Sequence, residues 1–534
     1  MFSPSHRAQL IEFCAEAATA IQKECDSILS KSDQADESSL VGCGPALVDL
    51  LLRQARQIAT CYREWQSENP GQSELSTEKR ELVLRRLDDI ISVSYSKFYA
   101  FLFKDLPTCW RQLYTDASIL KFCFSLLWSP YVDDNTAEGG QTHYKRFHGA
   151  ECDISELVRI LDLALILAGA AGRQRGRRWV NKALELLHVT WTEFTAPIGL
   201  PVIERPSKRK KLAGALDLAS THDEFELEDV FSTREPFTPP VEHPIKCVDS
   251  LPMEEFQTYL DNPQDPKLGP EPLVIRGALK EWPALTTNPW NKPSYLLSQT
   301  FGGRRLVPIE VGRSYVDEGW SQKLVTFGEF LCEYIDPSLA GARGKSDIGS
   351  PPSSLQKPSI AYLAQHPLFT QLPALRNDIL IPDYCYTAPP PHPTDSSIDQ
   401  PELDEPLINA WFGPPGTITP LHTDPYHNIL TQVVGRKYLR LYSPLVTERM
   451  RARGKENGVE MGNTSLMDVG VIEGWDTISD DEENQSTEED LAAFREVPFL
   501  DCILEPGDAL YIPIGWWHYV RGLSVSFSVS FWWN

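Results

Sequence analysis

Residues 409–424, Asn409-Ala-Trp-Phe-Gly-Pro-Pro-Gly-Thr-Ile-Thr-Pro-Leu-His-Thr-Asp424, give the clearest indication of how this chain folds. The stretch passes from a short apolar run into a turn rich in proline and glycine, and it ends in the H-x-D triplet of His422 and Asp424. At a strand edge, residues two apart point to the same side, so this pair could share one metal ion. Because a lone H-x-D triplet also arises by chance, the surrounding residues have to decide its meaning.

A third ligand is available at His518, within Pro513-Ile-Gly-Trp-Trp-His-Tyr519. Two histidines and one carboxylate make the facial triad that binds Fe(II) and leaves coordination positions open for a co-substrate and O₂. Taken alone, His518 would more often be a histidine packed in a core. Together with His422 and Asp424, it predicts a metal site built from two distant parts of the chain.

Lys437 adds a second kind of signal. In the run Arg436-Lys-Tyr-Leu-Arg-Leu-Tyr442, period-two alternation places Lys437 on the same face as Leu439 and Leu441. A lysine on an inward apolar face is costly unless an anion meets it there. The alternative is a lysine at the mouth of the strand that reaches solvent. Beside a metal site, the first interpretation predicts an anchor for a dicarboxylate.

The C-terminal half contains most of the expected strands. Residues 273–276 and 306–311 are short β-branched runs bounded by turn residues, and 429–434 and 437–442 flank a glycine turn. Residues 500–504 and 509–512, on either side of Glu505-Pro-Gly-Asp508, are expected to form a hairpin.

The run Ser524-Val-Ser-Phe-Ser-Val-Ser-Phe531 is the most regular strand pattern in the chain. One face of this strand would be large and apolar, and the other would carry only serine. A face of small side chains inside a β-barrel leaves room for a ligand. The pattern therefore predicts a barrel strand beside a binding cavity.

The N-terminal half differs, because its apolar residues recur at helical spacing, as in Leu47, Leu51, Ala55 and Ile58. We expect about six helices there. The fold class is therefore α+β and multidomain, with a helical domain at residues 1–200 and a β-rich domain at 243–534.

Several stretches indicate connections between elements. Residues 201–242 are an expected linker with a basic cluster at 205–211, which is either a solvated charge run or a nuclear-import signal. The stretches 338–358, 387–406 and 473–490 are expected to be surface insertions, and the last is strongly acidic.

Composition limits the function. The 534 residues contain 50 Lys plus Arg against 74 Asp plus Glu, a net charge of −24. Such a chain is not expected to bind nucleic acid directly, whereas a basic protein or peptide would be attracted to it. The 11 cysteines form no C-x-x-C pair, which argues against zinc fingers and for a reducing compartment. The longest apolar run, 163–171, is too short for a membrane span. We expect a soluble intracellular protein, nuclear or cytoplasmic.

The chain resembles the JmjC-domain oxygenases in four stretches: 409–424, Gly435-Arg-Lys-Tyr-Leu-Arg-Leu-Tyr-Ser-Pro444, 513–518 and 527–533. The resemblance covers roughly residues 245–534. It implies a double-stranded β-helix, which is a jelly-roll or cupin-like fold. It also implies Fe(II) as cofactor, with 2-oxoglutarate and O₂ as co-substrates.

By this resemblance, the iron ligands would be His422, Asp424 and His518. Lys437 would hold the distal carboxylate of 2-oxoglutarate. The residues that the resemblance adds as helpers of this lysine are Tyr384, Thr419 and Asn428.

The resemblance also places Glu310 and Trp320 in the substrate cleft. A carboxylate beside an aromatic face suits a guanidinium group, so we expect hydroxylation of an arginine in a basic protein. The alternative within enzymes is demethylation of a methyl-lysine in a histone, such as the H3 tail. From another class, the chain could be a catalytically silent module whose helical domain binds a protein partner, and a sugar-binding cupin is a more distant alternative.

Overall fold

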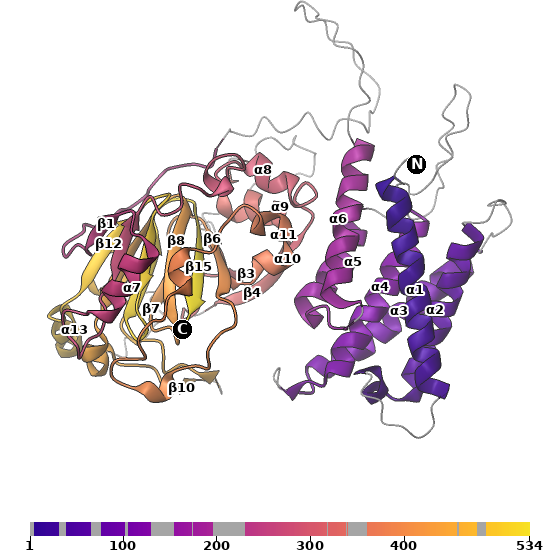
Figure 1. Cartoon of the computed structure of the whole chain (residues 1–534), viewed down its shortest axis with the longest axis horizontal. Helices are drawn as coiled ribbons and strands as arrows, with labels where there is room; N and C mark the ends of the chain where they lie inside the picture. Colours follow the sequence, from indigo (N-terminus) through magenta and orange to yellow (C-terminus); the bar gives the residue numbers. More distant parts are fainter. Residues whose placement is uncertain are drawn as a thin grey trace, which may run out of the picture. The chain divides into compact units, whose positions relative to one another are not determined.

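The structure of the chain is a computed structural model that divides into a helical unit and a β-rich unit (Figure 1). It describes residues 5–30, 39–65, 76–101, 105–129, 154–173, 175–195, 230–317, 319–337, 339, 360–456, 459–477 and 487–534. The basic cluster at 205–211 lies outside the described residues, as does nearly all of the insertion expected at 338–358.

The helical unit contains the six helices expected from the spacing of apolar residues. They are α1 (His6–Ser30), α2 (Pro45–Trp65), α3 (Thr77–Phe98), α4 (Thr108–Leu127), α5 (Ile154–Ala168) and α6 (Gly176–Thr195), with a 3₁₀ turn η1 (Ser39–Cys43). Helix α4 is the central one, since all five other helices contact it and most of its residues are buried. None of the helices in the described part of the chain is long and apolar enough to cross a membrane.

The β-rich unit is built from two main sheets. The nine-stranded sheet has the order β1 (Cys247–Asp249), β2 (Leu273–Arg276), β13 (Ala509–Ile512), β8 (His427–Val434), β15 (Ser526–Trp533), β6 (Leu407–Gly413), β5 (Ala361–His366), β3 (Leu306–Val311) and β4 (Ser321–Thr326). The four-stranded sheet has the order β12 (Leu500–Leu504), β9 (Lys437–Tyr442), β14 (Trp517–Gly522) and β7 (Ile418–His422). In a separate small sheet, β10 (Lys455–Glu456) pairs antiparallel with β11 (Val459–Glu460).

The two sheets face one another across a shared apolar layer. Leu430 and Leu510 from the nine-stranded sheet and Leu439 and Leu441 from the four-stranded sheet belong to the same buried cluster. Side chains of facing strands fill the space between sheets in this way in jelly-roll folds. The structure thus confirms the fold class, a helical domain followed by a cupin-like β domain.

Short helices cover the outer faces of both sheets. The short helices that lie between β1 and β6 in the chain include α7 (Met253–Asp261), η3 (Pro283–Leu285), α8 (Pro293–Ser298), α9 (Phe327–Phe330), η4 (Leu331–Ile335), α10 (Leu368–Gln371), α11 (Pro373–Arg376), η6 (Asp383–Tyr386) and η7 (Ser396–Ile398). Between β9 and β12 lie η8 (Pro444–Met450), α12 (Val469–Ile472) and α13 (Glu488–Arg495).

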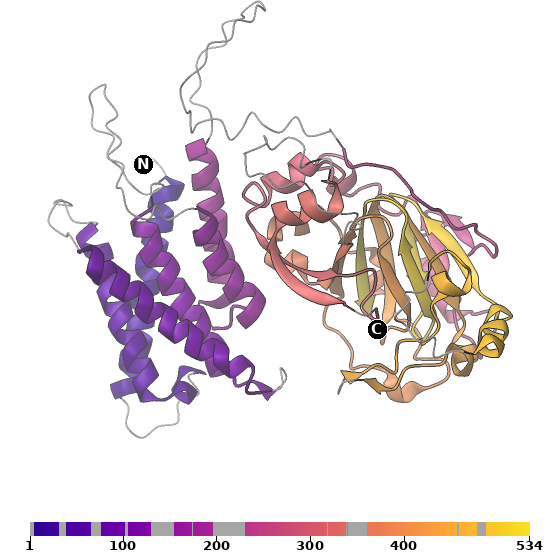
Figure 2. The same ribbon diagram turned by 180° about the vertical axis from the view of Figure 1, so that it is seen from behind.

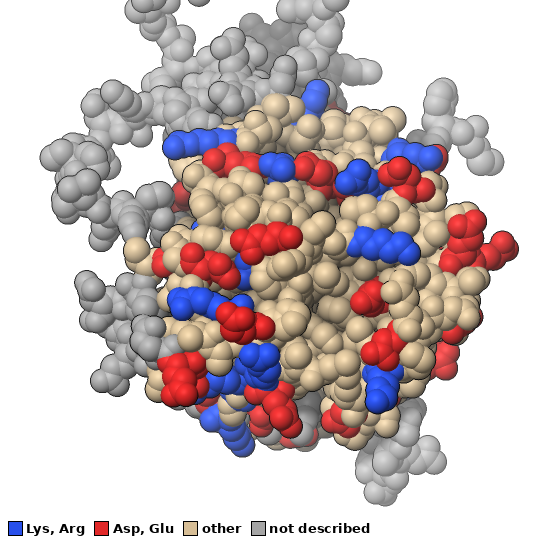
Figure 3. All heavy atoms as spheres, turned by 90° about the vertical axis from the view of Figure 1, so that its left-hand side faces the viewer, with Lys and Arg blue, Asp and Glu red and all other residues tan. Residues whose placement is uncertain are grey.

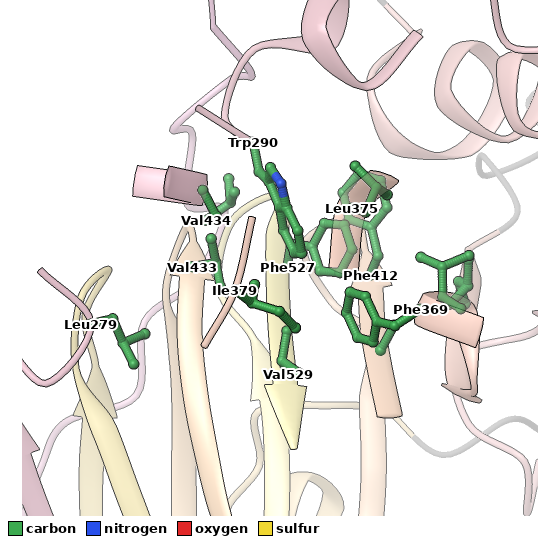
Figure 4. Close-up of a cluster of buried hydrophobic side chains, with 14 of the residues drawn as sticks. Leu279, Trp290, Phe369, Leu375, Ile379, Phe412, Val433, Val434, Phe527 and Val529 are labelled. Atoms are coloured by element: carbon green, nitrogen blue, oxygen red, sulfur yellow. The ribbon is translucent and has the colours of Figure 1, made fainter. Parts of the chain in front are cut away.

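A large core cluster lies on the outer face of the nine-stranded sheet (Figure 4). There the rings of Phe412 and Phe527 stack with centroids 4.6 Å apart, and Trp290 lies 4.6 Å from Phe527. These residues come from β6, β15 and the loop before α8. Aromatic pairs of this size contribute more than their buried area alone, so this cluster fixes β15 in the middle of the sheet.

The serine pattern of 524–531 is confirmed as a strand with two unlike faces. The apolar residues join the outer core, whereas Ser528 donates a hydrogen bond to Gln432 (2.7 Å) and Ser530 accepts one from Trp411 (3.0 Å). The hydroxyl of Ser526 is buried and has no hydrogen-bond partner among the described residues. Figure 2 shows the same sheets from behind.

One expectation about local pairing was wrong. Residues 500–504 and 509–512 do not form a hairpin, because β12 pairs with β9 in one sheet and β13 pairs with β2 and β8 in the other. The turn at Pro506-Gly507 carries the chain from one sheet to the sheet opposite. The inward side chains of the two strands therefore meet face to face, and no hydrogen bonds join their backbones.

The last residues of the expected linker pack on the β-rich unit. Phe231 is only 4% exposed within its main core, and Glu235 accepts hydrogen bonds from Arg436 at 2.8 and 2.9 Å. The insertion expected at 387–406 is described and contains η7, whereas the acidic residues 478–486 lie outside the described residues.

Candidate metal and co-substrate site

The two strands β7 and β14 bring His422 and His518 together. The strands pair antiparallel with these residues directly opposite each other, and their ring centroids are 4.1 Å apart. Asp424 follows two residues after His422, with its carboxylate oxygens 3.6 Å from Nε2 of His422 and 3.5 Å from Nε2 of His518. One ligand atom from each residue can be chosen so that all three lie within 4.8 Å of one another.

The backbone orients both imidazoles for metal binding. The Nδ1 atom of His422 lies 2.8 Å from the carbonyl oxygen of Pro420, and Nδ1 of His518 lies 3.0 Å from the carbonyl oxygen of Trp516. A carbonyl oxygen only accepts, so each Nδ1 must carry the proton and each Nε2 keeps a free lone pair. Both lone pairs are therefore available beside the carboxylate of Asp424.

The protonation states suit the same role. Burial, reinforced by the nearby His518, lowers the pKa of His422 to about 4, so its ring is neutral at physiological pH. Burial alone would raise the pKa of Asp424, but its interactions with the two histidines outweigh burial and lower that pKa. Two imidazoles whose Nε2 atoms lie beside one carboxylate fit the facial set of ligands that binds Fe(II).

Lys437 lies inside the β-rich unit and is only 1% exposed. Its Nζ atom donates a hydrogen bond to the hydroxyl of Tyr362 at 3.0 Å. No carboxylate of the described residues lies within ion-pair distance of it, and burial lowers its pKa to about 7. A buried ammonium without an anion is unfavourable, so this site is suited to bind a carboxylate from solution.

The register places Lys437 at a defined distance from the metal ligands. Lys437 lies opposite Gly522 on β14, four residues beyond His518 on the same strand. Four residues of strand span about 13 Å, a distance that a lysine side chain and a short dicarboxylate can cover together. The geometry thus fits a ligand with one end at the metal and the other at Lys437.

Two more buried polar residues, Thr419 and Asn428, contact this group of side chains. Thr419 is buried on β7 and hydrogen-bonds to the phenol of Tyr362. Asn428 donates a hydrogen bond to Asp424 (3.5 Å), while its own side-chain oxygen is buried and has no partner among the described residues. The structure therefore brings the predicted residues Thr419, Asn428 and Lys437 into one site with the metal ligands.

Tyr384 is not part of this cluster of contacts. Its hydroxyl donates to the carbonyl oxygen of Leu251 at 2.8 Å, and its ring packs against Phe256. The tyrosine beside the lysine is Tyr362 on β5, which the sequence reasoning leaves unassigned. The feature of the sequence that could have indicated Tyr362 is the short apolar run Ile360-Ala-Tyr-Leu363, which is typical of a buried strand.

Glu310 and Trp320 lie next to each other at the same site. The indole nitrogen of Trp320 donates to the carboxylate of Glu310 at 3.4 Å, and Glu310 stands opposite Tyr362 in the pairing of β3 with β5. Burial raises the pKa of Glu310, an effect that the hydrogen bond from Trp320 opposes. Among the described residues, no basic side chain forms an ion pair with Glu310, which leaves its carboxylate available to a cationic ligand.

Comparisons with known proteins agree with this site. Residues 267–534 match the family model described as a cupin-like domain. The chain is 39% identical over 295 residues to lysine-specific demethylase 8 of Danio rerio, which covers 55% of this chain and 60% of that protein. It is 41% identical over 263 residues to lysine-specific demethylase JMJ30 of Arabidopsis thaliana, covering 49% and 50%.

A third relative is Jumonji C domain-containing protein 5 of Drosophila melanogaster, 37% identical over 292 residues, with 54% of this chain and 60% of that protein covered. The matched stretch thus spans half to three fifths of these relatives. The comparisons confirm the resemblance to JmjC proteins, including the narrower likeness to JmjC domain-containing protein 5 that the same motifs carry.

Proposed function

The chain belongs to the cupin-like family of JmjC domains, and on this premise we propose that it is a dioxygenase that uses Fe(II) and 2-oxoglutarate to hydroxylate arginine in a basic protein. When bound, Fe(II) with 2-oxoglutarate and O₂ would oxidise a C–H bond of the substrate. The protein would hold the reactants in place and exclude water from the site. The observation that carries the choice of arginine is the free carboxylate of Glu310 beside Trp320.

In this proposal the metal is held by His422, Asp424 and His518. The carbonyl oxygens that fix their Nδ1 protons keep both histidines in the tautomer that a metal needs. The largely buried carboxylate of Asp424 adds one negative charge, so the ligand set neutralises part of the charge of a divalent ion.

The 2-oxoglutarate would extend from the metal to Lys437. Its distal carboxylate would accept hydrogen bonds from the ammonium of Lys437 and the phenol of Tyr362, and Thr419 would support that phenol. A charge-assisted hydrogen bond in a buried site is worth roughly twice a neutral one. The unpartnered side-chain oxygen of Asn428 would accept a hydrogen bond from bound water or ligand.

The substrate side chain would enter beside Glu310. A guanidinium can form a bidentate pair with the carboxylate and stack on the indole of Trp320 at the same time. On the face shown in Figure 3, acidic and basic residues are interspersed. We infer that the net charge of −24 attracts a basic protein in general, while Glu310 selects the side chain.

Demethylation of a methyl-lysine, for instance in a histone, is the second candidate. Its support is that two of the relatives carry the name lysine-specific demethylase. A methylated ammonium could also stack on an aromatic face, but it offers fewer N–H donors than a guanidinium for the carboxylate of Glu310.

A catalytically silent module is less well supported. A silent domain has no need for a buried lysine without an anion together with two oriented imidazoles and a carboxylate. We propose that the helical unit binds a protein partner. We also propose that the protein acts in the nucleus or cytoplasm, where an Fe(II) enzyme that modifies basic proteins would meet its substrates.

Mass spectrometry of basic peptides after turnover tests the proposed reaction. The full chain, loaded with Fe(II), would be incubated with 2-oxoglutarate, O₂ and paired peptides that differ only in having arginine or methyl-lysine at one position. A gain of one oxygen on arginine is the expected result. Loss of a methyl group from lysine, without oxidation of arginine, would establish the demethylase instead.

A further inference from the structure

Arg313 forms the centre of a group of ion pairs beside the proposed substrate site. It lies in the loop 312–320 between β3 and β4, three residues after Glu310. Its guanidinium contacts Asp317 of the same loop (3.0 and 3.2 Å), Asp468 (2.7 Å) and Asp476 (3.1 Å). With only 23% of its side chain exposed, Arg313 is largely shielded from solvent, where ion pairs are screened less.

Asp476 connects this group to a strand that carries a metal ligand. Its two carboxylate oxygens accept hydrogen bonds from Arg521 at 2.7 and 2.9 Å, and Arg521 lies on β14, three residues after His518. Two guanidiniums and three carboxylates thus form one network. The network links the loop 312–320 to the segment 468–476 and to β14.

The backbone at Gly470 is adapted to this network. Asp468 caps α12 by accepting hydrogen bonds from the amides of Gly470 (2.9 Å) and Val471 (3.2 Å). A Cβ atom added at Gly470 would lie 2.0 Å from a carboxylate oxygen of Asp476. The carboxylate of Asp476 can therefore reach the arginines only because residue 470 has no side chain.

Inside the loop, a short series of contacts leads from Arg313 to Trp320. Arg313 holds the carboxylate of Asp317, and the backbone carbonyl of Asp317 accepts the amide of Trp320 at 3.3 Å. The indole of Trp320 in turn donates to Glu310. The backbone carbonyl of Arg313 also accepts the amide of Ile418, the first residue of β7. The place of the Trp320 ring thus depends on the contacts of Arg313.

From this geometry we propose that Arg313 is a positioning residue that sets the substrate pocket by holding Trp320 beside Glu310. The inference rests on the proposed function, because it assumes that the substrate side chain binds between those two residues. Arg313 itself does not touch the substrate. Arg313 uses Nε and both terminal nitrogens in four contacts with three carboxylates, and the single nitrogen of a lysine cannot reproduce this spread of donors.

Arg440 provides a matched control. It is also buried, and it also binds the segment 468–476, through Glu473 at 2.5 Å. Its guanidinium lies 3.9 Å from the ring centre of Phe499, and its hydrogen bonds and ring contacts to described residues do not reach the loop 312–320. Arg440→Lys and Arg313→Lys therefore each remove a guanidinium that contacts the segment 468–476, but only Arg313→Lys affects the loop.

Steady-state kinetics with the arginine peptide test the proposal. Arg313→Lys is expected to raise the KM for the peptide at least tenfold, with a change of less than threefold in the KM for 2-oxoglutarate. Arg440→Lys is expected to leave both KM values within twofold of the parent. An unchanged peptide KM in Arg313→Lys, or an equal rise in both variants, overturns the proposal.

Hydrogen exchange gives a readout that does not need turnover. In Arg313→Lys the amide of Trp320 is expected to exchange at least tenfold faster, whereas in Arg440→Lys it exchanges as in the parent. If the parent oxidises no peptide, the proposed function fails while this measurement still decides whether Arg313 orders the loop. Unchanged exchange at Trp320 refutes that ordering.

Asp317→Asn and Gly470→Ala cover the case in which Arg313→Lys does not fold. Asp317→Asn weakens only the contact of Arg313 within the loop, and Arg313 keeps its ion pairs with Asp468 and Asp476. Gly470→Ala displaces Asp476 without removing any charge. Both variants are expected to raise the peptide KM and the exchange rate at Trp320 at least threefold. If neither variant raises the peptide KM, or if neither raises the exchange rate, the proposal is contradicted.

Discussion

The Nζ atom of Lys437 lies 3.0 Å from the hydroxyl oxygen of Tyr362, in a buried site where the pKa of the lysine is lowered to about 7. The cause is burial without an opposing charge. A bound carboxylate would supply that charge and raise the pKa again. If 2-oxoglutarate binds at Lys437 as proposed, its binding should therefore be coupled to the uptake of a proton by this lysine.

This coupling predicts a pH dependence of affinity. Above pH 7 the free protein holds Lys437 mostly neutral, so binding must first protonate it, and affinity should fall by up to about tenfold per pH unit. Anaerobic titration calorimetry of the Fe(II) protein, in buffers of different ionisation enthalpy, would measure the proton uptake. In Lys437→Arg the charge is permanent, so the uptake should disappear; equal uptake in both proteins would show that another group titrates.

Tyr362 and Tyr384 can be distinguished by the same substitution to phenylalanine. Tyr362→Phe removes a hydrogen-bond partner of Lys437 and should weaken 2-oxoglutarate binding by about tenfold, or about 1.4 kcal/mol. Tyr384→Phe loses a hydrogen bond to Leu251 and should lower the free energy of unfolding by about 1 kcal/mol, without affecting that binding. Calorimetric affinities and denaturant unfolding would be compared. If Tyr384→Phe weakened 2-oxoglutarate binding and Tyr362→Phe did not, Tyr384 would contact 2-oxoglutarate, as the family resemblance implies.

Removal of a metal ligand should abolish both metal binding and 2-oxoglutarate turnover. In Asp424→Ala the site retains only two imidazoles, so we expect Fe(II) affinity to fall at least a hundredfold. His427→Gln is the control, because this buried histidine bonds to Tyr511 and the carbonyl of Pro390 rather than to the cluster. Metal content after dialysis and substrate-independent decarboxylation of 2-oxoglutarate provide two measures. Full turnover by Asp424→Ala would refute the metal assignment.

The role of Glu310 in side-chain selection is testable by an isosteric change. Glu310→Gln keeps the size and the contact with Trp320 but removes the negative charge, and should lower kcat/KM for the arginine peptide by about 30- to 100-fold, or about 2–3 kcal/mol. The rate of decarboxylation without peptide should change far less. A neutral arginine analogue, such as a citrulline peptide, should be oxidised poorly by the parent. Equal kinetics for the parent and the Glu310→Gln variant would remove the observation on which the choice of arginine rests.

Gly435 should be essential for joining the two sheets. It has a φ of +66° at the turn between β8 and β9, and an added Cβ would lie 1.9 Å from the carbonyl oxygen of Val525. Gly474 has a similar φ of +73° and open space around it. Gly474→Ala should cost about 1 kcal/mol of unfolding free energy, and Gly435→Ala several times that, because only the latter adds a clash. Similar midpoints in urea would show that the clash is relieved cheaply.

His422, Asp424 and Lys437 could be predicted from sequence because their signals are local, whereas His518 was assigned only by its combination with the H-x-D triplet and by the family resemblance. His422 and Asp424 are two residues apart, and Lys437 alternates with leucines in one strand, so period-two geometry alone fixes which side chains share a face. The strand β15 and its two unlike faces could be predicted from the alternating serines for the same reason. The structure supports these assignments of position, while the roles of the residues in binding stay predictions.

Other features depend on which strands lie opposite each other, and local sequence does not encode that. The turn 505–508 reads as a hairpin, but β12 and β13 belong to different sheets because their apolar faces fit across the core. Tyr362 was missed because only the pairing of β5 with β3 brings it beside Glu310. The contacts of Arg313 with residues 468 and 476 likewise join parts of the chain about 160 residues apart.

The central position of β15 has a consequence for how the β-rich unit folds. Residues 526–533 pair with β8 and β6, which lie at 427–434 and 407–413, so these neighbours are synthesised long before the strand that separates them. Until β15 arrives, two hydrogen-bonding edges and the aromatic surface around Phe412 are exposed. Pairings this distant in sequence form slowly, and the unfinished sheet is prone to associate with other chains. Production of this protein in cells should therefore benefit from chaperones and slow synthesis, and loss of β15 should cause aggregation rather than merely loss of activity.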